Sequence, residues 1–319
     1  MNIEFQSRCK RQKQVLISLV RVITIAFFIP CIVFEAIAQE FEFRFNPPDG
    51  IAFVQTSKIT KIKDLGPLGK QTDETESKTK VVIKKTPSGY SAIFTPISAT
   101  MSQDGKKVDN LILSLLQDIV VTYEVDAKGQ LKTISGFDTL EKKIKETFPP
   151  EAVESLSTVI NEQTMINKEK AEWNGRIGSF VGSRVNLGDV WTSTDEFALP
   201  KGGTVTFYST TKVADKVKCG TWDCLQIQFS YNSDAKALKD FIGKVASDIA
   251  EAANSPKPKP EISEVEIDGG GERLIDPNTM LIYSETLTRT MKIPMEVPGQ
   301  GKVMTTMQEK REYTFDYAK

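Results

Sequence analysis

Alternating hydrophobic and polar positions run through most of the chain from about residue 40 onward. Phe41, Phe43 and Phe45 alternate with polar residues, which is the period-2 pattern of a strand with one buried face. The strand-like runs that follow are Ile51 to Ile62, Lys80 to Lys85, Tyr90 to Met101 and Val120 to Ile134. Polar segments such as Gln71 to Lys78 separate them, and Asp126-Ala127-Lys128-Gly129 turns the last run into a hairpin. This half of the chain therefore predicts an antiparallel meander.

The spacing of the hydrophobic residues changes from a strand-like to a helical period near the middle of the chain. Leu140, Ile144 and Phe148 are four residues apart, which is the spacing of one helical face. Prolines at Pro149-Pro150 allow one helix to end and another to begin, and we expect a helical insertion at about residues 137–181. A second helix is predicted at about residues 233–254, where one apolar face comprises Leu238, Phe241, Ile242, Val245 and Ile249.

Strand-like runs return between and after these helices. They are Asp189 to Trp191, Thr204 to Val217, Cys224 to Phe229, Glu261 to Ile267, Glu272 to Ile275, Met280 to Thr290 and Val303 to Tyr317. Gly269-Gly270-Gly271 and Asp276-Pro277-Asn278-Thr279 are the predicted turns among the later strands. The aromatic residues of the closing strand alternate like those of the opening one, so the first and last strands are expected to line one core.

The whole pattern predicts an α+β fold in a single β-rich domain over residues 39–319. We expect a strongly curved, half-barrel-like antiparallel β-sheet with helical segments packed on one face or end.

Residues 1–38 are expected to form a signal peptide. Four basic residues precede an apolar run from Val15 to Phe34, and Ala36-Ile37-Ala38 forms a cleavage site before Gln39. An uncleaved membrane anchor is the alternative, because this run is 20 residues long, although Arg21 and Pro30 interrupt it. The expected location is extracytoplasmic, periplasmic or secreted, after cleavage near Ala38-Gln39. We expect the membrane to be involved in only two ways: the protein crosses it during export, or the N-terminal segment stays uncleaved and anchors the protein.

The composition limits the possible functions. The chain has 319 residues, of which 39% are hydrophobic and 26% are charged, and it contains no histidine. Mechanisms with an imidazole base and metal sites with histidine ligands are therefore excluded. The first 38 residues hold five basic and two acidic residues, so their removal changes the formal net charge from −1 to −4. No basic field remains for a polyanion, and nucleic-acid binding is not expected.

Cleavage would leave Cys219 and Cys224 as the remaining cysteine pair. A hairpin with a four-residue loop between them would place the two residues opposite each other, within reach of a disulfide bond. A disulfide in an oxidising compartment is the preferred interpretation. A redox-active dithiol and a metal site are alternatives, but the spacing is not C-x-x-C and a metal would need two further ligands.

Three short motifs resemble those of a family of exported, β-rich bacterial proteins of unknown function. They are Gly129-Gln130-Leu131 through Gly136-Phe137-Asp138-Thr139-Leu140, Gly188-Asp189-Val190-Trp191 with its G-D-x-W signature, and Gly271-Glu272 through the D-x-x-T turn Asp276-Pro277-Asn278-Thr279. The resemblance implies a β-rich extracytoplasmic protein without an assigned activity. The order of strands and helical middle is also similar, at the level of fold, to the curved-sheet lipoprotein carriers of the cell envelope.

Enzyme motifs are present only in fragments. Ser233-Asp234-Ala235-Lys236 matches the S-x-x-K motif of penicillin-binding enzymes, but no S-D-N or K-[ST]-G accompanies it, so Ser233 is interpreted as a helix N-cap. Trp191 could be a ligand platform, although a core anchor is preferred. No pair of carboxylates is singled out as a glycosidase would require. We therefore predict no catalytic, cofactor-binding or metal-binding residues, no cofactor, and a protein that is not an enzyme.

The second predicted helix carries the leading functional hypothesis. It either covers one face of the sheet or forms a lid over an apolar cavity, in which Leu238, Phe241, Ile242 and Val245 contact a lipid-like ligand. The expected function is a non-enzymatic extracytoplasmic binding protein for a hydrophobic small molecule. A structural or protein-interaction module, with an envelope protein as partner, is the alternative, and a carboxylate-dependent hydrolase is the third hypothesis.

Overall fold

The computed structural model describes residues 39–66, 69–150, 153, 156, 160–198, 204–233, 239–240, 265–297 and 301–317. From Glu40 onward these residues belong to one compact unit. The predicted signal peptide at residues 1–38 lies outside the described residues. No helix within the described ranges is long and apolar enough to cross a membrane.

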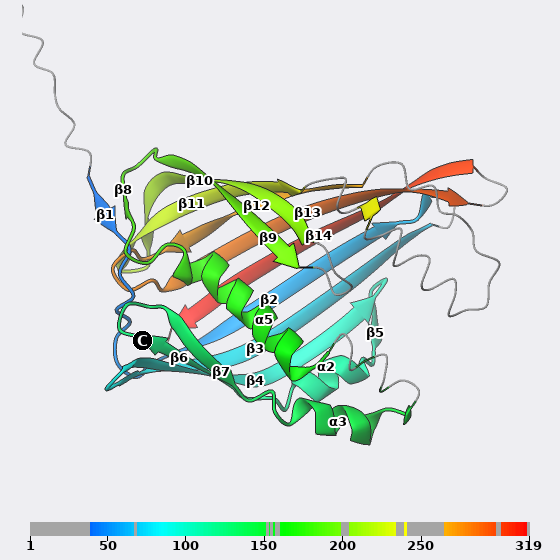
Figure 1. Cartoon of the computed structure of the whole chain (residues 1–319), viewed down its shortest axis with the longest axis horizontal. Helices are drawn as coiled ribbons and strands as arrows, with labels where there is room; N and C mark the ends of the chain where they lie inside the picture. Colours follow the sequence, from blue (N-terminus) through cyan, green and yellow to red (C-terminus); the bar gives the residue numbers. More distant parts are fainter. Residues whose placement is uncertain are drawn as a thin grey trace, which may run out of the picture. The chain divides into compact units, whose positions relative to one another are not determined.

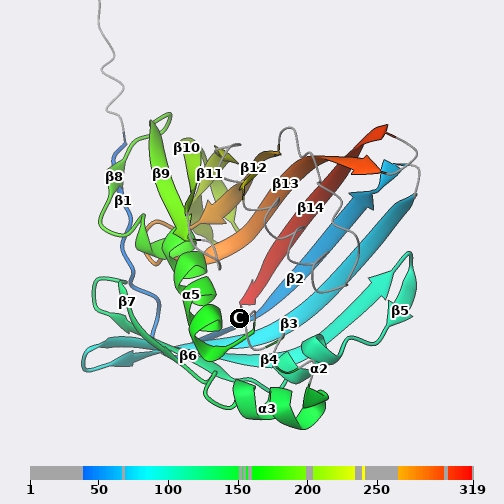
Figure 2. The same cartoon turned by 45° about the vertical axis from the view of Figure 1, so that its right-hand side comes forward.

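Twelve strands of the described residues form one large sheet in which all neighbours are antiparallel. In chain order they are β2 (Ile51–Asp64), β3 (Lys70–Thr86), β4 (Gly89–Gln103), β5 (Lys106–Val108), β6 (Val121–Asp126), β7 (Leu131–Ser135), β9 (Val190–Ala198), β10 (Thr204–Cys219), β11 (Trp222–Ser233), β12 (Glu266–Ile275), β13 (Ile282–Val297) and β14 (Gly301–Tyr317). The sheet curves strongly, as Figure 1 and Figure 2 show. The predicted α+β class with a curved antiparallel sheet is therefore confirmed.

Two meanders make up the sheet, and the last strand joins them. The order across the sheet is β7-β6-β4-β3-β2-β14-β13-β12-β11-β10-β9, with β5 paired to β4. β14 therefore lies between β2 and β13, with Tyr317 opposite Phe53 and Thr306 opposite Asp64. The middle of the sheet is built from the first long strand and the last strand of the chain.

The opening phenylalanines lie beside this sheet, not in it. β1 comprises only Phe41–Glu42 and pairs with the short strand β8 (Arg184–Val185). Phe43 and Phe45 follow β1 and are buried, and the ring of Phe43 lies 5.5 Å from that of Phe180. Both belong to the same hydrophobic core against which the closing aromatic residues pack. The predicted shared core is present, but the strand predicted over Phe41 to Phe45 ends at Glu42.

The helical insertion in the middle of the chain is also present. It contains α3 (Leu140–Thr147), α5 (Glu162–Trp173) and the π-helical turn η2 (Asn174–Gly178). Figure 1 and Figure 2 show α5 lying across the concave side of the sheet. A further helix, α2 (Leu111–Leu116), was not predicted, because a short apolar run without periodicity does not distinguish helix from strand. Asn110 caps it by accepting a hydrogen bond of 2.9 Å from the amide of Leu113.

Two predicted interruptions of the sheet are instead strand. The polar segment Gln71 to Lys78 belongs to β3, and its residues pair with both β2 and β4. Gly269-Gly270-Gly271, predicted as a turn, lies in the middle of β12 between β11 and β13. A Cβ atom at Gly271 would lie 2.0 Å from the carbonyl oxygen of Thr286, so the close approach of the two backbones requires glycine there.

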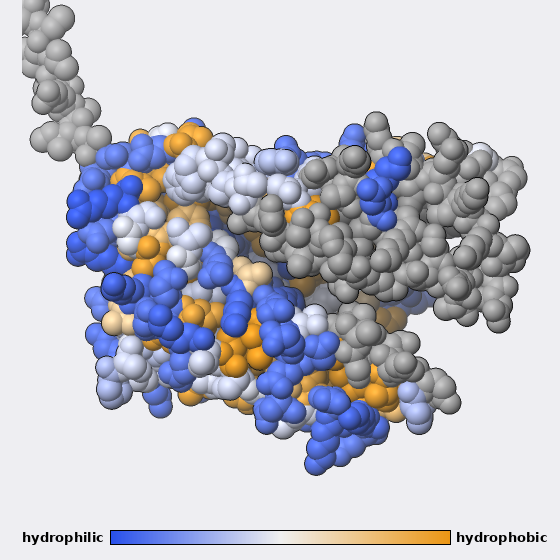
Figure 3. Space-filling model, in the orientation of Figure 1, coloured by the Kyte–Doolittle hydropathy of each residue, from blue (hydrophilic) through white to orange (hydrophobic). Residues whose placement is uncertain are grey.

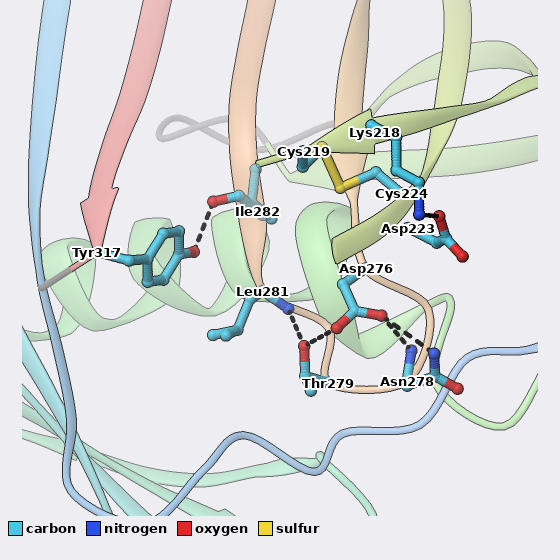
Figure 4. The surroundings of a disulfide bond; sticks show 10 residues. All are labelled: Lys218, Cys219, Asp223, Cys224, Asp276, Asn278, Thr279, Leu281, Ile282 and Tyr317. Atoms are coloured by element: carbon cyan, nitrogen blue, oxygen red, sulfur yellow. Dashed lines mark hydrogen bonds and ion pairs between the residues drawn. A yellow bond between two sulfur atoms is a disulfide. The ribbon is translucent and has the colours of Figure 1, made fainter. Parts of the chain in front are cut away.

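The cysteine hairpin has a tighter turn than predicted. Gly220 and Thr221 alone connect β10 to β11, so Cys219 pairs with Trp222 and Cys224 pairs with Val217. The two cysteines are diagonal neighbours with Cα atoms 5.9 Å apart, and they form a disulfide bond. Figure 4 shows this bond near the D-x-x-T turn, where Asp276 accepts a hydrogen bond of 2.7 Å from the hydroxyl of Thr279. The disulfide bond is present, but the predicted four-residue loop is wrong.

Candidate functional site

A cavity of about 390 Å³ opens between the concave face of the sheet and the helices. Its walls come from β2, β3, β4, β6, β13 and β14 on the sheet side and from α2, α5 and η2 on the other. Figure 3 shows hydrophobic side chains gathered between hydrophilic ones on this side of the molecule, in the region where Figure 1 places α5. A volume of this size lies within the range of pockets that hold small ligands.

The sheet wall begins with an entirely hydrophobic row of side chains. Cross-strand pairing places five residues of neighbouring strands side by side, and all five line the cavity: Tyr317, Phe53, Val81, Phe94 and Val121. The rings of Phe53 and Tyr317 lie 4.9 Å apart. The hydroxyl of Tyr317 donates a hydrogen bond of 2.6 Å to the backbone oxygen of Ile282 (Figure 4), so its polar atom does not interrupt the apolar wall.

The wall becomes more polar from row to row along the strands. The second row consists of Phe315, Gln55, Thr79 and Pro96, and the third consists of Tyr313, Ser57, Ser77 and Ala99. Residues two apart on a strand share a face, so these rows continue the concave surface on which the hydrophobic row lies. The cavity therefore has an apolar end and a polar end.

Helix α5 and η2 supply a charged wall opposite the sheet. Lys168, Glu169, Glu172 and Arg176 line the cavity together with Met165, and their three- and four-residue spacing places them on one helical face. On the side of α5 that faces the core, Trp173 is buried and its indole donates a hydrogen bond of 3.1 Å to the backbone oxygen of Gly129. This bond fixes the end of α5 to the β6–β7 turn.

Glu169 is a half-buried acidic group on this wall. It accepts a short hydrogen bond from the hydroxyl of Tyr123, which is itself buried on β6. Burial and the neighbouring charge of Glu172 raise the pKa of Glu169 above the usual 4.5. Burial and the adjacent carboxylate also raise the pKa of Tyr123, so its proton stays on the phenol. The pair forms a polar contact that holds α5 against β6.

A buried ion cluster lies behind the polar end of the cavity. Glu285 on β13 accepts hydrogen bonds from its cross-strand neighbour Arg273 and, at 2.7 Å, from Arg176. Burial alone would raise the pKa of Glu285, but the two guanidinium groups hold it below its usual value. Glu172 lies 3.7 Å from Arg176, so two cations face two carboxylates. The ring of Tyr313 lies beneath the guanidinium of Arg176 at 4.3 Å.

A second cluster continues the concave face beyond the third row. Glu309 on β14 is 4% exposed and faces three cations: Arg311 at 2.5 Å, Arg289 at 3.1 Å and Lys61 at 3.6 Å. Burial would raise the pKa of Glu309, but these cations hold it below its usual value. Of the three, Arg311 lines the cavity.

The residues predicted from the sequence contribute little to this site. The predicted lid residues Leu238, Phe241, Ile242 and Val245 lie outside the described residues, and of that helix only Lys239 and Asp240 are described, as helical. Ser233 ends β11, and its buried hydroxyl has no hydrogen-bond partner within the described ranges. The backbone amides that an N-cap at Ser233 would bond lie outside the described residues, so the N-cap interpretation stays a prediction.

Trp191 lies near the start of β9, at the edge of the sheet. Its ring lies 6.0 Å from that of Phe180, and the half-buried side chain packs against the main core. This is the position of a core anchor, and Trp191 does not line the cavity described above.

The charged residues of the cavity were missed at the level of sequence. A local signal existed in the spacing of Lys168, Glu169, Glu172 and Arg176, but such spacing is usual for a solvent-exposed helix. The contact of Arg176 with Glu285 depends on how η2 packs on the sheet. The contacts of Glu309 with Lys61 and Arg289 depend on strand pairing. The local pattern shows neither. Among the described residues, no group of three or more acidic or cysteine side chains is arranged to hold a metal ion.

Comparisons with known proteins give distant structural similarities. No family model matches the chain, and no curated protein matches it. Lipovitellin, in a structure that concerns lipid–protein interactions, is 10% identical with a TM-score of 0.44; the match covers 85% of this chain and 25% of the lipovitellin chain. This chain therefore corresponds to about a quarter of the length of lipovitellin.

Two bacterial proteins show further similarity. A protein of Bacteroides fragilis, described as exported and as having a YmcC-like fold, is 10% identical with a TM-score of 0.26, and the match covers 87% of this chain and 100% of that one. DynF from the dynemicin biosynthesis pathway of Micromonospora chersina is 9% identical with a TM-score of 0.19, and the match covers 89% and 88%. All TM-scores are below 0.5, so no function is transferred from these proteins.

Proposed function

We propose that this protein is a non-enzymatic, extracytoplasmic binding protein whose cavity holds a ligand with an apolar tail. The observation that carries the proposal is the cavity of about 390 Å³ whose wall starts with the hydrophobic row from Tyr317 to Val121. Protein interiors are close-packed, with few voids larger than a water molecule. A space of this volume lined by aromatic and aliphatic side chains favours a binding role over a purely structural one.

The state of the charged groups supports a role in binding. Glu285 is held by two arginines, Glu172 by Arg176, and Glu169 by Tyr123. Groups that are paired in this way stabilise the packing of the helix on the sheet. A general base or a nucleophile, in contrast, must be free to contact a substrate. The disulfide bond between Cys219 and Cys224 supports an extracytoplasmic location, because such bonds persist in oxidising compartments.

The proposal can be tested by exporting the full chain in a bacterial host and measuring its mass under native conditions. Co-purifying lipid is expected, together with uptake of a fluorescent fatty acid by protein from which the lipid has been removed. A clean apo mass with no uptake of the fatty acid would contradict the proposal and favour the alternative of a structural module with an envelope protein as partner.

A cavity-filling variant tests the location of the ligand. Thr79 is half-buried in the second row of the wall, so Thr79→Trp should fill the cavity and weaken fatty-acid uptake by about tenfold or more, equivalent to about 1.4 kcal/mol. Thr95 on the neighbouring strand is exposed and does not line the cavity. The matched variant Thr95→Trp should bind like the wild type, and an equal loss in both variants would place the ligand elsewhere.

A further inference from the structure

We infer that the ligand of this cavity is an anionic amphiphile, with the tail of an acyl chain at the hydrophobic row and a negatively charged head group at Arg311. This inference rests on the proposed binding function and specifies the chemical class of the ligand. Three features of the described residues support it: the direction of polarity along the wall, the balance of charge in the first ion cluster, and its imbalance in the second.

The direction of polarity is clearest along β14. The side chains that this strand presents to the concave face are, in order, Tyr317, Phe315, Tyr313, Arg311 and Glu309, and the first four line the cavity. Arg311 lies six positions before Tyr317 in the sequence, which corresponds to a distance of about 20 Å along an extended strand. A long acyl chain can therefore lie with its tail at Tyr317 and its head at Arg311.

The first ion cluster is neutral and cannot attract an anion strongly. Arg273 and Arg176 carry two positive charges, and Glu285 and Glu172 carry two negative charges within hydrogen-bond or ion-pair distance. Arg176 is also stacked on the ring of Tyr313. The remaining carboxyl group of this wall, Glu169, bonds to Tyr123.

The second cluster has a surplus of positive charge. Within the part of the chain that the structure describes, Glu309 is the carboxylate within ion-pair distance of Arg289, Arg311 and Lys61. One negative charge therefore faces three positive charges. The nearby Lys63 does not add to this surplus, because it pairs with Asp73 at 2.9 Å.

Arg311 presents this surplus to the cavity. Its side chain is 29% exposed although the side chain of Glu309 is 4% exposed, and it lines the cavity next to Ser57 and Ile59. A guanidinium group carries five N–H donors. In Arg311 the Nε donor bonds to Glu309 and a further hydrogen bond involves Tyr313, which leaves other donors for a ligand. A carboxylate or phosphate at this place would meet a fork of donors that suits such oxyanions.

The test compares two ligands that share one chain and differ in the head group. Binding of hexadecanoate and hexadecanol to the full chain is measured by displacement of a fluorescent probe at low and high salt. We expect hexadecanoate to bind about tenfold tighter or more, and we expect this preference to shrink with salt. Hexadecyl phosphate should share the preference, whereas inorganic phosphate and acetate alone should not displace the probe.

A matched pair of variants assigns the preference to one side chain. Arg311→Gln should reduce the ratio of hexadecanoate to hexadecanol affinity to nearly one. Lys310→Gln removes the same charge from the adjacent residue, whose exposed side chain pairs with Glu312 and does not line the cavity, and it should keep the preference. Arg311→Lys should retain part of it.

The outcomes separate this inference from the proposed function. Equal binding of both ligands to the wild type would overturn the anionic head group but leave the cavity as a binding site. Loss of the preference in Lys310→Gln to the same extent as in Arg311→Gln would overturn the assignment to Arg311. Failure of both ligands to bind the wild type would contradict the proposed function itself.

Discussion

Arg273 and Glu285 face each other across the β12–β13 pair, and their side chains are 5% and 1% exposed. Arg273 also donates hydrogen bonds of 3.2 and 3.0 Å to the backbone oxygens of Gly175 and Arg176. These carbonyl groups lie at the C-terminal end of the helical segment, where a cation is favourable. A single buried ion pair therefore joins two strands of the sheet to the end of the helix that covers the cavity.

Removing the acid of this pair should strongly destabilise the protein. Glu285→Gln would leave Arg273 and Arg176 buried without their shared carboxylate, and we expect a loss of about 3–5 kcal/mol in the free energy of unfolding. Urea denaturation followed by tryptophan fluorescence measures this loss. The control is Glu272→Gln on the opposite face of β12, where the exposed carboxylate accepts a bond from Gln226 and the expected change is below about 0.5 kcal/mol. Similar losses in both variants would contradict the role of the buried pair.

Stability should depend on pH through Glu169 in a direction opposite to that of most carboxylates. Burial and Glu172 raise the pKa of Glu169 in the folded state. Its contribution to stability is therefore complete below the unfolded pKa near 4.5 and is lost as the pH rises through the folded pKa. Glu169→Gln cannot ionise and keeps an acceptor for Tyr123, so the stability of the variant relative to the wild type should increase with pH across this window.

The measurement is the difference in unfolding free energy between Glu169→Gln and the wild type from about pH 4 to about pH 8. Its slope cannot exceed about 1.4 kcal/mol per pH unit for one group. Carboxylates with lowered pKa values, such as Glu285 and Glu309, contribute equally to both proteins and cancel. A flat difference for Glu169→Gln across this range would contradict the raised pKa of Glu169.

The glycine segment of β12 should not tolerate a side chain at Gly271. A methyl group there would meet the backbone oxygen of Thr286, and Gly271→Ala should lower the free energy of unfolding by about 1–3 kcal/mol. Gly175 provides the matched control, because a Cβ atom there has no neighbour within 4 Å. Gly175→Ala should be neutral or slightly stabilising. Equal urea midpoints for the two variants would show that β13 can move away from β12.

The local pattern of hydrophobic and polar residues predicted those strands and helices in which that pattern repeats regularly. Alternation located most of the strands, including the hairpin around the turn Asp126 to Gly129, and four-residue spacing located α3. The polar part of β3 was missed, because both its concave and convex faces carry polar residues paired with neighbouring strands, such as Asp73 with Lys63. The glycines of β12 were interpreted as a turn, since glycine usually marks one, whereas here it allows two backbones to approach.

Most residues of the candidate site could not be predicted from local sequence patterns. Its wall depends on the position of β14 beside β2, and its ion clusters join Arg176 to Glu285 and Lys61 to Glu309. Contacts between residues so distant in sequence do not affect the local periodicity of hydrophobic and polar residues, so that periodicity cannot predict them. The general expectation of an apolar space between sheet and helix was available from the sequence, but the charged residues at its polar end were not.

The position of β14 also determines when the cavity can form during synthesis. Phe53 is among the first residues of the sheet to be made, but its partner Tyr317 is among the last. Pairings between distant segments are slow to form, and domains fold as units once their chain is available. A nascent or truncated chain without β14 lacks Tyr317 and Phe315 of the wall and leaves β2 and β13 without the strand between them. If the cavity binds a ligand as proposed, we expect loading only once β14 is complete.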